Sequence, residues 1–216
     1  MMQDAPPKVV MVQDEPRHHQ VFHQGAVRIL DVQIPPGEVT LFHTHDTAIL
    51  YVPISISPTD TQILGKDWLG VKPTDRSRFE DLVVATDTSY ALKPLTHRVK
   101  NVGDRLFRLI AITNGSAGSL RQDVAPPGTV VHSSPWYAAA WLVVDPHAES
   151  EWHTAAMPTV VVAPSGGRVK VEGSEAAHSR LDEPGSWSYV PAGGRYRFAN
   201  EGQAPVTVVI VEANQP

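Results

Sequence analysis

Three histidines carry the clearest chemistry in this sequence. His43 and His45 are separated by one residue, and His97 follows much later in the chain. A Pro-Pro-Gly turn at residues 35–37 precedes the first pair, and the run after it is expected to be extended. Successive strand side chains alternate between faces, so His43 and His45 point the same way, about 6–7 Å apart. Imidazole binds zinc, iron, nickel and copper, so this pattern predicts a metal site rather than a catalytic triad.

The spacing of these histidines resembles two motifs of the cupin family. In the first motif, five residues separate a Gly from His-x-His, as residues 38–42 separate Gly37 from His43 and His45. The second motif ends in His, three residues and Asn, as His97 and Asn101 do. The glutamate of the first motif would fall at residue 49 or 50, which are Ile and Leu and cannot bind a metal. The resemblance therefore implies a three-histidine variant, with His43, His45 and His97 as the metal ligands.

The second half of the chain repeats the pattern of the first. Pro146, His147 and His153 fall where Pro36, Gly37 and His43 stand, and residues 191–200 fit the second motif with Tyr196 replacing the histidine. Such an internal repeat points to a duplicated unit. By resemblance we expect an all-β fold of two tandem jelly-roll barrels, in which facing sheets cover their own edges. The expected limits are a flexible N-terminal arm (1–17), a metal-binding barrel (18–113), a linker (114–128) and a second barrel (129–216).

The second barrel is expected to bind no metal. Ala155 and Tyr196 occupy two of its three ligand positions, and His153 keeps only the first. Glu151 lies two residues before His153 and shares its strand face if the strand is regular. Glu151, His153 and Tyr196 are therefore predicted to form a vestigial polar cluster.

Two further side chains are candidates for contact with a substrate. Tyr51 should share the face of His45, six residues along, and Arg98 adjoins His97 and could receive a carboxylate. The simpler interpretations are an ordinary barrel-interior tyrosine and a solvated arginine. His18, His19 and His23 are interpreted as polar residues of a surface strand, and residues 57–80 as a long loop or hairpin.

Composition narrows the class of protein. The net charge of −5 offers no basic field for nucleic acid or acidic lipid, and no apolar run approaches the ~18 residues that cross a bilayer. The absence of cysteine removes disulfides and thiolate chemistry. The N-terminal residues do not form a signal peptide. We expect a cytoplasmic protein that binds a small-molecule ligand, with no nucleic-acid or membrane partner. Resemblance to cupins implies a homodimer, or a monomer in which the two barrels of one chain mimic that dimer.

Two classes of function remain open from the sequence. The first, implied by the resemblance to three-histidine cupins, is a mononuclear non-haem dioxygenase, with iron preferred and zinc or nickel as alternatives, acting on a small anionic or enolisable substrate. The second is a non-catalytic small-molecule binding or sensing protein that keeps a structural or vestigial metal. A sugar epimerase or isomerase of the same fold is less favoured, because the sequence shows no clear catalytic His–Asp pair.

Overall fold

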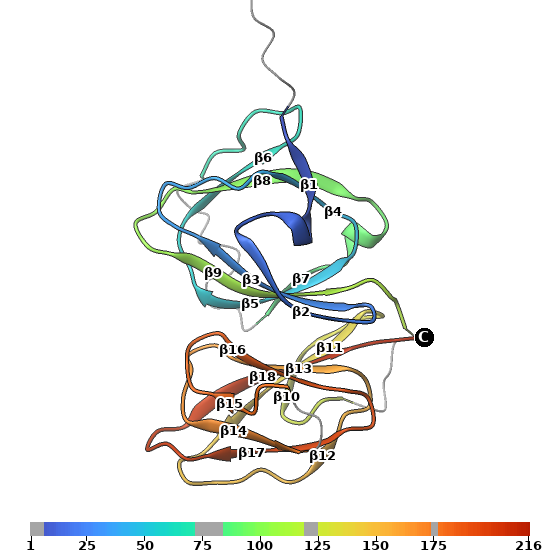
Figure 1. The fold of residues 1–216 in the computed structure, drawn as a ribbon, viewed down its shortest axis with the longest axis vertical. Coiled ribbons are helices and arrows are strands. Elements are labelled where there is room, and N and C mark those ends of the chain that lie inside the picture. The colour runs from blue at the N-terminus through green and yellow to red at the C-terminus, as the bar shows by residue number, and fades with distance from the viewer. Residues whose placement is uncertain (1–6, 72–83, 119–124, 174–176) are drawn as a thin grey trace, which may run out of the picture.

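The structure is a computed structural model that describes residues 7–71, 84–118, 125–173 and 177–216. Within these ranges the regular secondary structure consists of β-strands and two short 3₁₀ turns (Figure 1). The β-branched and alternating segments form the strands, and most of the described prolines and glycines fall between them. No helix among these residues has the length and apolar character needed to cross a membrane.

The first half folds into two facing sheets (Figure 1). The four-stranded sheet runs in the order β1 (Val9–Met11), β4 (Phe42–His45), β8 (Leu95–Asn101) and β6 (Thr59–Ile63). The five-stranded sheet runs in the order β2 (His18–Gln24), β3 (Val27–Ile34), β9 (Phe107–Asn114), β5 (Ala48–Ser55) and β7 (Ala85–Asp87). The turns are η1 (Val12–Asp14) and η2 (Ser89–Ala91). Apolar side chains that include Leu30, Ile49 and Leu109 form the core of this half.

The second half repeats this arrangement. Its five-stranded sheet runs in the order β10 (Thr129–Ser133), β11 (Tyr137–Val144), β18 (Val206–Ala213), β13 (Thr159–Ala163) and β16 (Ser186–Val190). Its four-stranded sheet runs in the order β12 (His153–Thr154), β17 (Arg195–Asn200), β14 (Val169–Gly173) and β15 (Arg180–Leu181). Strands β12, β17 and β14 thus repeat the order of β4, β8 and β6. The prediction of an all-β fold with two tandem jelly-roll units is confirmed.

Local details of the two halves also match. A register shift follows Gln20 in β2, and one follows Val130 at the equivalent place in β10. Buried Asn101 donates from Nδ2 to the carbonyl oxygens of Ile34 and Arg105, at 2.8 and 2.7 Å. Asn200 makes the equivalent bonds to the carbonyl oxygens of Val144 and Ala204, at 2.9 and 2.8 Å. These asparagines tie each second-motif turn to the end of a strand in the facing sheet.

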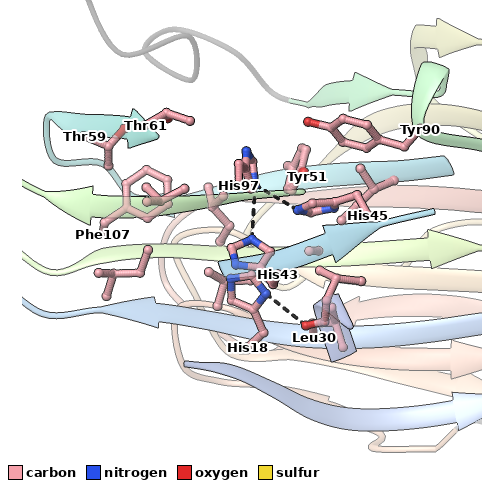
Figure 2. A pocket seen from close by; sticks show the side chains of 17 residues that line it. His18, Leu30, His43, His45, Tyr51, Thr59, Thr61, Tyr90, His97 and Phe107 are labelled. Carbon is pink, nitrogen blue, oxygen red and sulfur yellow. Dashed lines mark hydrogen bonds between the residues drawn. The ribbon is translucent and has the colours of Figure 1, made fainter. Parts of the chain in front are cut away.

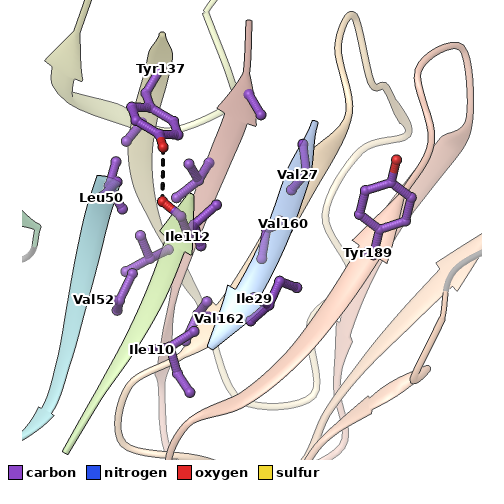
Figure 3. Close-up of a cluster of buried hydrophobic side chains, with 14 of the residues drawn as sticks. Val27, Ile29, Leu50, Val52, Ile110, Ile112, Tyr137, Val160, Val162 and Tyr189 are labelled. Carbon is purple, nitrogen blue, oxygen red and sulfur yellow. Dashed lines mark hydrogen bonds between the residues drawn. The ribbon is translucent and has the colours of Figure 1, made fainter. Parts of the chain in front are cut away.

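The two five-stranded sheets pack against each other and join the halves (Figure 1). Their contact is a buried apolar cluster to which both halves contribute, including Ile112 from the first and Val160 from the second. The hydroxyl group of Tyr137 lies 2.8 Å from the carbonyl oxygens of both Ala48 and Ile112, and Figure 3 shows it reaching toward Ile112. Burial of this hydroxyl is tolerated because it is hydrogen-bonded.

One segment differs from the sequence interpretation, and a second, expected to be a long loop or hairpin, forms a hairpin in its described part, closed by an antiparallel bridge between Gln62 and Trp68. Residues 1–17 were expected to be a flexible arm, but Val9–Met11 pairs in parallel with β4, and Val12 and Glu15 are buried. Apolar residues within the polar N-terminal stretch give it this strand. Within residues 57–80, Thr59–Ile63 forms β6 and pairs with β8, while residues 72–80 lie outside the described part of the chain. The expected limits of the two barrels and the linker stay a prediction.

Candidate metal centre

The three predicted ligands meet at one place on the four-stranded sheet. Strand β4 carries His43 and His45 on one face, and β8 pairs with it so that His43 lies opposite His97. The Nε2 atom of His97 lies 3.1 Å from Nε2 of His43 and 3.1 Å from Nε2 of His45. Figure 2 shows the three rings pointing toward a common centre. Two segments more than fifty residues apart in sequence are therefore joined by strand pairing.

His43 is held in the form that a metal ligand requires. Its Nδ1 lies 2.9 Å from the carbonyl oxygen of Leu41. A carbonyl oxygen can only accept, so Nδ1 carries the hydrogen and Nε2 presents a lone pair to the other two rings. Burial lowers the pKa of His43 to about 4, against the weaker opposing effect of the hydrogen bond to Leu41. The ring is therefore neutral at physiological pH, as ligation requires.

The spacing of the Nε2 atoms suits a bound cation. Two nitrogen atoms bound to one ion at about 2.1 Å and at right angles lie about 3.0 Å apart, close to the observed 3.1 Å. Hydrogen bonds among the three rings satisfy their Nε2 atoms less well than a bound cation would. Because the Nε2 atom of His43 bears no hydrogen, a single Nε2–H of His97 would have to serve two acceptors. The three histidines are also the one group of potential metal ligands that converges within the described residues.

A cavity of about 120 Å³ opens beside the histidines, between the two sheets of the first half. Its wall is mostly aliphatic, with Phe107 at one end and the hydroxyl groups of Tyr51, Thr59, Thr61 and Tyr90 as the other polar groups (Figure 2). No aspartate, glutamate, lysine or arginine is among the described residues that line it. The glutamate of the first motif would fall at residue 49 or 50. Ile49 is buried and forms part of this wall.

The two candidate substrate contacts have different outcomes. Tyr51 is buried and lines the cavity as expected, but it reaches the cavity from β5 in the facing sheet rather than from the strand face of His45. Arg98 does not line it. Alternation along β8 turns Arg98 to the opposite face from His97, where its guanidinium lies 4.7 Å from the ring centroid of Phe42 and 4.9 Å from that of Trp68. Its Nε also donates to Gln62 at 2.7 Å, so Arg98 does not face the cavity, and its role as a carboxylate receptor stays an untested prediction.

Sequence analysis missed two rings at the site. His18 was interpreted as a surface residue, but it is buried, lines the cavity and contacts the His43 ring edge-on with centroids 4.5 Å apart. Burial, and secondarily His43, lower the pKa of His18 well below its usual value. His19 and His23 are exposed as predicted. Tyr90 packs against His45 with ring centroids 4.7 Å apart, and no motif marked it.

The second half places its three candidate residues only partly together. His153 lies opposite Tyr196 across β12 and β17, with ring centroids 5.6 Å apart. His153 Nε2 and the Tyr196 hydroxyl are buried and have no hydrogen-bond partner among the described residues. Burial lowers the pKa of His153, and the charge of exposed Glu151 opposes that shift. Tyr196 and Ala155 are fully buried in the apolar core of this half.

Comparison with known proteins agrees with this architecture. No protein-family model and no curated protein sequence matches the chain. Among solved structures, AerE from Microcystis aeruginosa superposes with a TM-score of 0.63 at 10% identity, over 90% of both chains. A cupin 2 conserved barrel domain protein from Leptotrichia buccalis superposes with a TM-score of 0.51 at 14% identity, over 90% of this chain and 87% of that one. The chain has the cupin fold.

Enzymes also occur among the cupin-fold neighbours. Salicylate 1,2-dioxygenase from Pseudaminobacter salicylatoxidans superposes with a TM-score of 0.57 at 9% identity, covering 87% of this chain and 71% of that one. A variant of that dioxygenase has been solved in complex with gentisate. At this identity the likeness concerns the fold. This chain adds to it a converging group of three histidines beside a cavity.

Proposed function

We propose that this cupin-fold chain binds a divalent metal ion through His43, His45 and His97 and acts as a non-haem dioxygenase on a small anionic or enolisable substrate. Iron(II) is the preferred ion, with zinc or nickel as alternatives. The observation that carries the proposal is the convergence of three Nε2 atoms, two of them 3.1 Å from the third, at the wall of a cavity. The dioxygenase among the fold neighbours supports the reaction class.

The charge of the site supports the substrate class. Three neutral imidazoles leave a divalent ion its full charge, and the described wall contributes no carboxylate. A ligand that brings its own negative charge, such as an enolate or a pair of chelating oxygens, compensates the ion best. The hydroxyl groups of Tyr51, Thr59 and Thr61 are placed to hydrogen-bond the oxygen atoms of such a ligand.

The size of the cavity limits the substrate. An apolar cavity of about 150 Å³ accommodates benzene, so about 120 Å³ suits a molecule of roughly that size or smaller. The aliphatic wall excludes water and favours an apolar body on the substrate. Iron(II) bound here would supply the activation of dioxygen next to the substrate. The protein's own part is to hold three neutral imidazoles, keep the cavity dry and orient the ligand.

A non-catalytic small-molecule binding protein is the second candidate. The observation that favours it is the same small volume, because about 120 Å³ leaves little room for both a substrate and dioxygen. In that case the metal is structural or vestigial. A cytoplasmic location remains a prediction from the sequence, and a homodimer remains a prediction from the resemblance; fractionation of the source cells and analytical ultracentrifugation test them.

Metal content and oxygen uptake separate the two candidates. Protein purified without a chelator is analysed for metal and then assayed for oxygen consumption with diketones, catechols and thiols. Iron with substrate-dependent oxygen uptake supports the dioxygenase. Zinc or nickel with ligand binding and no uptake supports the binding protein. His43→Ala is the control, and metal content unchanged by that substitution would contradict both.

A further inference from the structure

The N-terminal segment, residues 9–18, runs beside the three histidines, and we call it the N-terminal strap. It begins as β1, in which Val10 lies opposite His43 in parallel pairing with β4. It continues through η1, which lies in the opening between the two sheets of the first half (Figure 1). Val12 and His18, within this strap, both line the cavity. The strap is therefore a wall of the site, although it lies outside both motifs.

Glu15 is the buried acidic residue of the strap. Its side chain is only 1% exposed, and its Oε1 accepts a hydrogen bond from the backbone N–H of Leu41 at 3.1 Å. The carbonyl oxygen of the same Leu41 accepts the hydrogen bond from Nδ1 of His43 at 2.9 Å. Glu15 thus holds the residue that sets the tautomer and orientation of one metal ligand. Groups that hydrogen-bond a metal-ligating histidine influence metal affinity strongly, and Glu15 fixes the position of such a group, the backbone of Leu41.

His18 lies between Glu15 and His43. Its Nε2 is 4.0 Å from Oε2 of Glu15, and its Nδ1 lies 3.1 Å from the carbonyl oxygen of Val12. Its ring meets the His43 ring edge-on, directly below it in Figure 2. The imidazole therefore fills the space between the buried carboxylate and the ligand, and keeps water out of that space.

The negative charge of the buried Glu15 carboxylate must be compensated by its surroundings. Burying a carboxylate costs several kcal/mol unless a positive charge or good hydrogen bonds compensate it. Besides Leu41, Glu15 accepts a bond from the backbone N–H of Arg17 at 2.6 Å, and the Arg17 guanidinium comes only within 3.8 Å. Glu15 and Glu212 are the two buried acids of the described chain, and Glu212 belongs to the second half. A cation held by the nearby histidines gives Glu15 a further reason to be buried.

The second half lacks both residues. Counting from the equivalence of Pro36 and Pro146, and with β10 in the same register as β2, the counterparts of Glu15 and His18 are Ala125 and Gly128. This is the half in which two of the three ligand positions hold Ala155 and Tyr196. The carboxylate of the strap and the three-histidine group are thus present together in one half and absent together from the other.

We propose that Glu15 is a positioning residue of the metal centre, which orients His43 through Leu41 and places a negative charge behind the ligands. It compensates in part for the absence of a carboxylate ligand at position 49. This inference rests on the proposed metal binding. Its consequence is that metal affinity depends on a residue of the N-terminal strap that touches neither the ion nor the substrate.

Cobalt titration tests the role of Glu15. Wild-type protein, Glu15→Gln and Glu38→Gln are stripped with a chelator and titrated with Co²⁺, followed by visible absorption. Glu38→Gln is the matched control, because Glu38 pairs with the same Arg17 but is exposed. We expect Glu15→Gln to weaken Co²⁺ binding about 10- to 100-fold and to shift the cobalt absorption bands of the loaded protein. Glu38→Gln should leave both unchanged.

Each outcome bears on one claim. Glu15→Gln with the affinity and absorption bands of the wild type overturns the role of Glu15 while leaving the metal site intact. Wild-type protein that binds neither Co²⁺ nor Fe²⁺ overturns the proposed function itself. If Glu15→Gln does not unfold cooperatively in urea, Glu15→Asp replaces it, because the shorter side chain keeps the charge but draws the carboxylate away from the Leu41 N–H. Wild-type affinity and absorption bands in Glu15→Asp would then count against orientation of His43 through Leu41, and weakened binding with shifted bands would support it.

Discussion

His153 lies opposite Tyr196 across β12 and β17, in the same register that places His43 opposite His97 across β4 and β8. The duplicated scaffold has therefore kept the geometry of a cross-strand pair after one of its ligands changed. In the first half the pair faces a cavity. In the second half the tyrosine ring is part of the apolar core, and its hydroxyl has no described hydrogen-bond partner.

This difference predicts opposite effects for the same substitution at two tyrosines. Tyr196→Phe removes a buried hydroxyl that makes no hydrogen bond in the described structure, so it should raise the free energy of unfolding by about 1 kcal/mol. Tyr137→Phe removes a hydroxyl bonded to two buried carbonyl oxygens and should lower it by about 1–3 kcal/mol. Urea unfolding followed by circular dichroism measures both. Destabilisation by Tyr196→Phe would show that its hydroxyl has a structural or ligand-binding partner.

Acid should destabilise the metal-free protein between about pH 6.5 and pH 4. Burial lowers the pKa of His43 to about 4 in the folded state, against about 6.5 in the unfolded chain. The unfolded state then binds more protons in this window, so stability is full above pH 6.5 and is lost as the pH falls. The loss for one such group is about 2 kcal/mol between pH 7 and pH 5. Chelator-treated His43→Gln should show a smaller difference between those pH values, and an equal difference would contradict the assignment.

The turn that precedes each first motif offers a backbone test. Gly37 has a φ of 78° and His147, at the equivalent position, has a φ of 57°. A side chain in this left-handed region costs roughly 1 kcal/mol, whereas glycine adopts it freely. We expect His147→Gly to stabilise the protein by up to about 1 kcal/mol and Gly37→Ala to destabilise it by about as much. Thermal unfolding of the two variants should therefore move in opposite directions, and a shift in the same direction would count against the equivalence of the turns.

Arg98 and Tyr51 should differ in their effect on ligand binding. Arg98 lies on the outer face between Phe42 and Trp68, so Arg98→Met should leave the affinity for a chelating ligand within about twofold. Tyr51→Phe removes a hydroxyl from the cavity wall and should weaken that affinity by about three- to tenfold, the value of one hydrogen bond. Calorimetric titration of the cobalt-loaded protein with acetylacetone compares the two. A larger loss for Arg98→Met would mean that ligands approach from the outer face.

The sequence was informative where local rules apply. Strand alternation correctly placed His43 and His45 on one face of β4, and the repeated motifs indicated that Tyr196 would take the place of His97. Tyr51 lines the same cavity, but it does so from β5 in the facing sheet. The same alternation, applied to β8, would have turned Arg98 away from the cavity. The error came from treating proximity in sequence to His97 as proximity in space.

The rest of the site depends on contacts that no local pattern encodes. His18 belongs to a polar run whose outward-facing members, His19 and His23, are exposed. Its ring instead contacts two earlier residues of the strap, the carbonyl oxygen of Val12 at 3.1 Å and the carboxylate of Glu15 at 4.0 Å. That packing joins a short N-terminal strand to β4, some thirty residues later. The apolar run at residues 9–12 is a local signal for the strand, but the sequence does not indicate which strand it pairs with. Glu15, an acidic residue close to this apolar run, was the feature that sequence analysis could have considered as a support for the metal site.

The central claim is that imidazoles from two separate strands hold one metal ion, and metal analysis tests it most directly. Wild-type protein, His97→Ala and His19→Ala are expressed in parallel cultures in the same iron-supplemented medium and purified without a chelator. Their metal content is measured by inductively coupled plasma mass spectrometry. Exposed His19 controls for the loss of a histidine. We predict about one metal ion per chain in the wild type and in His19→Ala, and almost none in His97→Ala. Equal metal content in wild type and His97→Ala, or none in the wild type, would contradict the account.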